Sequence, residues 1–116
     1  MVAAERNINI LDYGNHCLRL VDLSQSPPTV STFAGSCTVS GDADGHRLNT
    51  ALFSYARQTQ VNNHNSALYV LDNYKFLNMI DLTTDIVTTL ATVSTYCFDM
   101  KILGDSMLYF TQSHAV

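Results

Sequence analysis

The sequence predicts an all-β protein built from repeated groups of short strands. Apolar residues alternate with other residues at a period of two, as at Ile8 and Ile10 and again at Leu68 and Val70, so each predicted strand has one apolar face. Clusters of Asp, Asn, Gly, Ser and Pro separate these stretches, and helical spacing is not sustained anywhere. With 116 residues, 47% of them hydrophobic and 14% charged, the chain has the composition of about one small globular domain.

An internal repeat organises the strands. Residues 10–23 return at 70–82, where the second copy is shorter by a residue in its turn. The threonine-rich, β-branched stretch 29–34 returns at 86–91, and a third, partial copy begins at 108–110. Such a repeat indicates an architecture in which each copy buries its apolar face against the next.

Turn residues divide the chain into three groups of strands. Residues 7–35 contain three predicted strands, residues 51–92 contain four, and residues 97–114 contain two. The turn at 12–15 closes the first hairpin. Residues 27–28 are both proline and must lie in the next turn, because proline has no N–H group to donate to a sheet.

The longest segment without a predicted strand is 35–46, which is rich in Ser, Gly and Asp and is expected to be an exposed loop. Within it, residues 41–45 place side-chain oxygens at alternating positions, as at the start of a calcium loop. The further ligands of such a loop, including its bidentate Glu, do not follow, so a solvated turn is predicted. His46, His64 and His114 match no zinc spacing, and no metal or other cofactor is expected.

The charge balance bears on possible partners. Six Lys and Arg residues against ten Asp and Glu residues give a net charge of -4, which offers no electrostatic attraction to a phosphate backbone. No apolar run approaches the roughly 18 residues of a membrane-spanning helix, and residues 1–7 lack the features of a signal peptide. We therefore expect neither nucleic-acid binding nor a membrane segment.

Cysteine usage gives a slight preference for a reducing, intracellular compartment. Cys17, Cys37 and Cys97 cannot all pair within one chain, so at least one is free or pairs outside it, and no Cys-x-x-Cys spacing occurs. Each cysteine is expected to be a small buried hydrophobic residue.

The stretch Asp12-x-Gly-Asn-His-x-Leu-Arg-x-Val-Asp22 resembles the signature of the NHL repeat. Segments 29–35, 41–45, 51–53 and 67–72 follow in the order that these repeats use. The resemblance implies a β-propeller, in which four-stranded antiparallel blades pack around a channel. The motif residues are Asp12, Gly14, Asn15, His16 and Asp22, with Asp72 and Asp81 in the second copy.

On this resemblance, residues 7–35 supply the last three strands of one blade, residues 51–92 supply one full blade, and residues 97–114 supply the first two strands of the next. Closed propellers have roughly four to eight blades, so this chain forms an incomplete propeller. Further blades are expected in cis, in a larger multidomain protein of which this chain is a fragment, or else by homo-oligomerisation. The fragment is favoured, because assembled copies would leave one strand redundant.

The motif residues are expected to be structural. Asp12 and Asp72 end strands and should accept hydrogen bonds from backbone N–H groups in Asx turns, and Asp22 and Asp81 should do the same in the following turns. A ring nitrogen of His16 is expected to bind a neighbouring backbone group or Asp12. No catalytic residue is assigned, because no nucleophile elbow, phosphate loop or reactive-cysteine signature occurs.

The predicted function is that of a noncatalytic scaffold that binds a protein partner, as propellers of this type commonly do. One alternative is a metal-dependent propeller enzyme resembling the peptidyl-hydroxyglycine amidating lyase, and another is an RNA-binding NHL propeller. The tyrosine and phenylalanine rings could stack on single-stranded nucleic acid, but they are expected to be core residues or cross-strand pairs.

Overall fold

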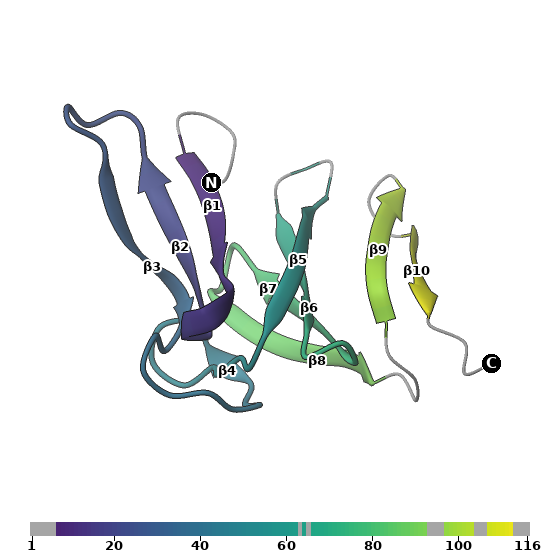
Figure 1. The fold of residues 1–116 in the computed structure, drawn as a ribbon. Helices are drawn as coiled ribbons and strands as arrows, with labels where there is room; N and C mark the ends of the chain where they lie inside the picture. Colours follow the sequence, from purple (N-terminus) through teal and green to yellow (C-terminus); the bar gives the residue numbers. More distant parts are fainter. Residues whose placement is uncertain (1–6, 63, 65, 93–96, 104–106, 113–116) are drawn as a thin grey trace.

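The computed structural model describes residues 7–62, 64, 66–92, 97–103 and 107–112 (Figure 1). These residues form ten strands and a single turn of 3-10 helix, η1, at Tyr13–Asn15. The strands are β1 (Asn7–Asp12), β2 (Cys17–Asp22), β3 (Thr29–Gly35), β4 (Gly45–His46), β5 (Ala56–Val61), β6 (Ala67–Asp72), β7 (Phe76–Asp81), β8 (Ile86–Thr92), β9 (Cys97–Leu103) and β10 (Met107–Gln112). The all-β prediction is confirmed.

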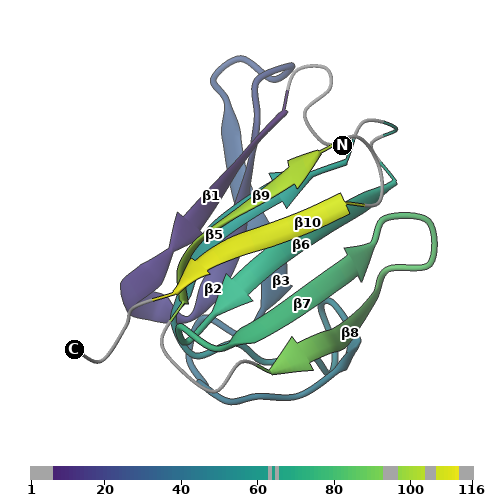
Figure 2. The same ribbon diagram turned by 90° about the vertical axis from the view of Figure 1, so that its right-hand side faces the viewer.

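The strands form three antiparallel sheets, which lie side by side in chain order (Figures 1 and 2). The first sheet has the order β1-β2-β3, the second β4-β8-β7-β6-β5, and the third consists of β9 and β10. Across the sheets, β1 lies next to β5 and β5 lies next to β9. The predicted groups of three, four and two strands coincide with β1–β3, β5–β8 and β9–β10, and β4 was not predicted.

The sequence repeat is also a structural repeat. The pairing of β2 with β3 shifts register at Phe33, and the pairing of β7 with β8 shifts register at Leu90, the residue at the equivalent position. A bulge of this kind leaves one residue unpaired and bends its strand. Strands β1-β2-β3 of the first sheet therefore match β6-β7-β8 of the second sheet, both in strand order and in the position of the bulge.

The hydrophobic core lies between the first and second sheets. Period-two alternation directs one apolar row from each strand into it, as the sequence predicts. Its buried members are Leu18, Phe33 and Ala34 of the first sheet, Ala56, Leu68, Val70, Ile80 and Val87 of the second sheet, and Ala51 and Phe53 of the segment between them.

The segment that crosses from the first sheet to the second, residues 36–55, is more structured than expected. Its β4 pairs with β8, and Ala43 pairs with Leu52. Asp44 is exposed, yet its carboxylate accepts hydrogen bonds from the backbone N–H (3.0 Å) and the hydroxyl (2.7 Å) of Thr89. The expectation of an exposed loop holds for residues 38–40, 42 and 44, which are exposed. The long-range contacts of the segment were not expected, because their partners lie far along the chain.

The expectation for the cysteines is wrong for two of the three. Cys17 and Cys37 form a disulfide, with their Cα atoms 5.0 Å apart, which ties the start of β2 to the crossing segment. Disulfides persist in oxidising compartments, so cysteine usage no longer favours a reducing one. Cys97 begins β9, but its side chain is not among those described, and His114 also lies outside the described residues. No helix in the described part of the chain is long and apolar enough to cross a membrane.

Candidate binding surface

Asp12, at the end of β1, does not make the expected Asx turn. Its carboxylate accepts hydrogen bonds from the side-chain amide of Asn15 (3.0 Å) and from Nε of Arg19 on β2 (3.1 Å), and it caps no backbone N–H of η1. The guanidinium provides a stronger, charge-assisted partner than a backbone amide would. Gly14 lies within η1, with open space where a side chain would project.

Asp72, at the end of β6, does cap backbone groups, but those of the crossing segment rather than of its own turn. Its carboxylate accepts hydrogen bonds from the N–H groups of Ser54 (3.0 Å) and Tyr55 (2.9 Å). The side chain is fully buried, and this burial raises the pKa of Asp72 to about 6 despite the opposing effect of these N–H donors. The local Asx turn expected for Asp72 is therefore wrong.

His16 meets the same crossing segment from the first sheet. Its Nδ1 hydrogen-bonds the carbonyl oxygen of Ser54, and its backbone is left-handed, with φ at 64°. A carbonyl can only accept, so Nδ1 carries the proton and donates it. The expected backbone partner is thus present, although it lies in the crossing segment, and the alternative partner Asp12 is not used. His16 and Asp72 together hold Ser54 between the two sheets.

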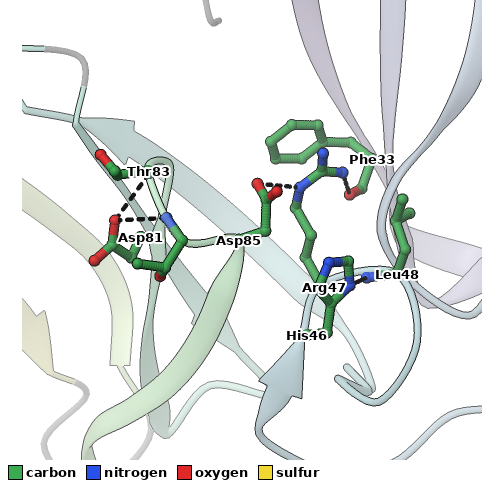
Figure 3. A network of polar contacts seen from close by, with 8 residues as sticks. Phe33, His46, Arg47, Leu48, Asp81, Thr83 and Asp85 are labelled. Carbon is green, nitrogen blue, oxygen red and sulfur yellow. Dashed lines mark hydrogen bonds and ion pairs between the residues drawn. The ribbon is translucent and has the colours of Figure 1, made fainter.

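Asp22 and Asp81 occupy equivalent turns of the repeat and make equivalent bonds. Asp22 accepts a hydrogen bond from the N–H of Ser24 (2.9 Å), and Asp81 accepts one from the N–H of Thr83 (2.9 Å; Figure 3). These are the bonds of an Asx turn, the role expected for both residues. They shape the hairpins β2–β3 and β7–β8.

Four side chains gather around the joint between the first two sheets, and we call them the tyrosine–arginine cluster: Tyr13, Tyr55, Arg57 and Tyr74. The guanidinium of Arg57 lies 4.4 Å from the ring centroid of Tyr74 and 5.6 Å from that of Tyr13. The ring centroids of Tyr13 and Tyr55 are 5.1 Å apart. Tyr13, Tyr55 and Arg57 are exposed, so the cluster forms part of the molecular surface.

The turn between β6 and β7 positions Tyr74 in this cluster. Asn73 and Tyr74 both have positive φ values, 53° and 65°, as the two central residues of a type I′ hairpin turn do. A bulky residue rarely adopts this backbone conformation. Here Nη1 of Arg57 donates a hydrogen bond to the Tyr74 hydroxyl (2.9 Å), and hydrogen bonding with Tyr74 raises the pKa of Tyr13. The cluster is therefore held together by polar bonds as well as by ring contacts.

Sequence reasoning missed this cluster. The expectation that the aromatic rings are core residues or cross-strand pairs holds for Phe53, which is buried, but not for Tyr13 and Tyr55, which are exposed. A signal was present, because Tyr13 and Tyr74 lie in turns that follow Asp12 and Asp72 rather than within the alternating strands. The alternation of a strand directs every second side chain into the core, but a turn imposes no such direction on an aromatic ring.

Arg47, in the crossing segment, also escaped prediction and joins the same two sheets (Figure 3). Its Nε donates to the carboxylate of Asp85 (2.9 Å), and its Nη1 donates to the carbonyl oxygen of Phe33 (2.6 Å). The guanidinium also lies 4.5 Å from the Phe33 ring centroid. The hydrogen bond from Arg47 holds the pKa of Asp85 below its ordinary value.

Among the described residues, no group of three or more His, Cys, Asp and Glu side chains is arranged to hold a metal ion. Of the predicted motif residues, His16 and Asp72 meet at Ser54, but the set as a whole does not converge on one site. Asp12 and Asp72 end equivalent strands, while Asp22 and Asp81 lie in separate hairpin turns. The tyrosine–arginine cluster is the feature that suggests binding.

Comparison with known proteins supports the fold and adds no function. No protein-family model matches the chain, and no curated protein matches its sequence. One similar structure is the crystal structure of a structural genomics protein of unknown function from Bacteroides thetaiotaomicron, with a TM-score of 0.75 and 20% sequence identity. The similarity covers 92% of this chain, which spans 30% of the length of that protein. At this level of identity the likeness shows a shared β-sheet-rich fold.

Proposed function

We propose that the chain is a noncatalytic interaction module of NHL-type β-propeller blades that binds a protein partner through the tyrosine–arginine cluster. The observation that carries the proposal is the exposed stack of Arg57 with Tyr13 and Tyr74 at the joint between two sheets. Tyrosine and arginine are enriched among the residues that dominate the energy of protein interfaces. Rings that already contact one another lose little freedom when a partner binds.

The arrangement of the sheets supports the propeller part of this proposal. Three antiparallel sheets lie in chain order, with β1, β5 and β9 as successive neighbours. In a propeller, sheets pack side by side around a central channel, and each of these sheets would form one blade. The blades are residues 7–35, 51–92 and 97–114, and the first and third are incomplete.

A protein partner fits the cluster better than a nucleic acid does. Stacked tyrosines can bind unpaired bases, but tight binding of this kind also needs several cationic contacts to phosphates. The cluster contains a single arginine, and the chain carries a net charge of -4. The guanidinium of Arg57 is instead suited to a carboxylate or backbone carbonyl of a protein, because it has further N–H groups to donate.

The proposal is tested by selecting a phage-displayed peptide library against the immobilised chain. Enriched peptides are synthesised, and their affinities are measured by fluorescence anisotropy. We expect Arg57→Ala and Tyr13→Ala each to weaken binding at least about tenfold, the loss typical of an interface hot spot. Val39→Ala, which truncates an exposed apolar residue outside the cluster, is the control and should retain the affinity.

Two results would contradict the proposal. One is a set of specific peptides whose affinity is unchanged by both cluster substitutions. The other is tight binding of a single-stranded RNA oligonucleotide that Arg57→Ala abolishes, which would support the RNA-binding alternative instead.

A further inference from the structure

The charge of Arg57 is met differently from the charges of the other two arginines within the described ranges. Nε of Arg19 lies 3.1 Å from a carboxylate oxygen of Asp12. Nε of Arg47 lies 2.9 Å from a carboxylate oxygen of Asp85. Among the residues that the structure describes, Arg57 forms no ion pair with a carboxylate, and its contacts are rings and a hydroxyl of the tyrosine–arginine cluster. Its positive charge is therefore not balanced by a bound carboxylate.

The acidic residues that precede the two turns of the cluster already have donors of their own. Asp12 accepts hydrogen bonds from the side chains of Asn15 and Arg19. Asp72 accepts hydrogen bonds from two backbone N–H groups of the crossing segment. A carboxylate for Arg57 would thus have to come from a binding partner.

The backbone of β5 is irregular at the point where it presents Arg57. The pairing of β5 with β6 shifts register between Ala56 and Gln58, which makes Arg57 the extra residue of a β-bulge. A bulge redirects the side chain that it carries, and bulges are over-represented beside functional sites. The hydroxyl of Tyr74 then accepts a hydrogen bond from Nη1 of Arg57 (2.9 Å). The guanidinium is thereby held in place, unlike that of an ordinary surface arginine.

The three rings of the cluster are also held by their backbone. Tyr74 has a φ of 65°, a conformation that bulky residues rarely adopt and that is found preferentially at functional sites. The N–H of Tyr55 donates a hydrogen bond to the buried carboxylate of Asp72 (2.9 Å), and Tyr13 begins η1. A ligand therefore meets a prearranged surface and orders few side chains when it binds.

A carboxylate suits this arrangement better than the other acceptors a partner could offer. Arg57 is exposed, and its guanidinium has further N–H groups beyond the one bound to Tyr74. The two oxygens of a carboxylate accept parallel N–H bonds from a guanidinium, and its single negative charge balances the single positive charge. A carbonyl group leaves the charge unbalanced. A phosphate group carries more negative charge than the one arginine of the cluster can balance.

We propose that the tyrosine–arginine cluster binds an acidic side chain, Asp or Glu, of its protein partner, with the carboxylate on Arg57. The inference rests on the proposed function, because it specifies which group of the partner the cluster recognises. The rings of Tyr13 and Tyr55, 43% and 41% exposed, provide the surface on which the adjoining peptide packs. The rings come from both sheets, so a peptide that continues in both directions from its acidic residue covers more of the cluster than a chain end does.

The test is a titration of the isotopically labelled chain with tetraglutamate and with tetraglutamine, both blocked at their two ends, followed by NMR spectroscopy. The two peptides have the same length and nearly the same shape, but only the first carries carboxylates. We expect tetraglutamate to shift the Nε–H resonance of Arg57 and the amide resonances of the cluster, and tetraglutamine to leave them unchanged at the same concentration.

Two variants with the same change in net charge show whether Arg57 is responsible. Arg57→Gln should weaken tetraglutamate binding at least about tenfold, as the loss of a charge-assisted contact at an interface hot spot does. Lys101→Gln removes a positive charge from an exposed residue of β9 and should retain the affinity. The dispersion of the amide resonances verifies that each variant is folded.

Three results would overturn the inference. One is equal binding of the two blocked peptides, and another is tetraglutamate binding that survives Arg57→Gln. The third comes from tetraglutamine with a free carboxyl terminus, whose one carboxylate is at its end. If this peptide binds as tightly as blocked tetraglutamate, the group recognised is a chain end and not an acidic side chain.

The peptides selected from the phage-displayed library separate this inference from the proposed function. Selected peptides that need Arg57 and Tyr13, but keep their affinity when every Asp and Glu is changed to Asn and Gln, would support the proposed function and overturn this inference. Selected peptides that need neither cluster residue would contradict the proposed function itself.

Discussion

Burial of Asp72 should make the protein less stable as the pH rises through the mildly acidic range. The carboxyl is fully buried at the joint between β6 and the crossing segment, and its pKa is raised from 3.8 to about 6. Between these two pH values the folded protein holds a proton on Asp72 that the unfolded chain has released. The preference of the folded state for protonated Asp72 thus contributes fully to stability below pH 3.8. This contribution is lost as the pH rises to about 6.

The magnitude follows from the two pKa values. Each tenfold change in proton affinity corresponds to about 1.4 kcal/mol, so the interval from 3.8 to about 6 amounts to about 3 kcal/mol of unfolding free energy. Desolvation of the carboxylate is the dominant cause. Hydrogen bonds from the N–H groups of Ser54 and Tyr55 oppose it, because they favour the charged form.

The assay is urea denaturation of the wild type and of Asp72→Asn across this pH range. Other carboxylates titrate in the same range, so the informative quantity is the difference between the two proteins. Asp72→Asn should gain about 3 kcal/mol relative to the wild type as the pH rises, because its amide cannot ionise. Leu71→Ala, a destabilising change on the same strand, should differ from the wild type by a constant amount. A flat or falling difference for Asp72→Asn would show that the N–H donors outweigh burial and would refute the reasoning.

Two further substitutions test the packing and the joint between the sheets. Val70→Ala should lower the unfolding free energy by about 2 to 4 kcal/mol through lost burial and a residual cavity, and an unchanged urea midpoint would contradict the placement of β6 in the core. Arg47→Lys keeps the positive charge but loses the planar guanidinium whose separate N–H groups reach Asp85 and Phe33. It should therefore lower the unfolding free energy by about 1 to 2 kcal/mol. If the lysine variant unfolds at the wild-type urea concentration, the guanidinium contacts contribute nothing to stability.

The strands could be predicted because their signal is local. Alternation at Ile8 and Ile10, or at Leu68 and Val70, reports which side of a strand is apolar without reference to any other part of the chain. The Asx turns of the two copies are equally local, since Asp81 binds an N–H group two residues away. The internal repeat also predicted which strands belong to the same group, because similar sequences fold in similar ways.

The contacts of the crossing segment could not be predicted in this way. Asp72 binds N–H groups at residues 54 and 55 because β5 pairs with β6 so that Ala56 lies opposite Asp72. Cys17 meets Cys37 because β2 pairs with β3 so that Gly35 lies opposite Cys17. Which residues then meet depends on the pairing register of the strands, which no local pattern encodes. Polar residues in an apparently irregular stretch were accordingly expected to face solvent.

The crossing segment determines more than the path between two sheets. It holds the first sheet through the Cys17–Cys37 disulfide and the second through Asp72, and Arg47 binds both. The tyrosine–arginine cluster lies across this same joint, because Tyr13 follows β1 whereas Tyr74 follows β6. Its rings can therefore stack only while the two sheets keep their relative position. A segment that resembles a solvated loop in sequence thus sets the geometry of the surface through which we propose that the protein binds its partner.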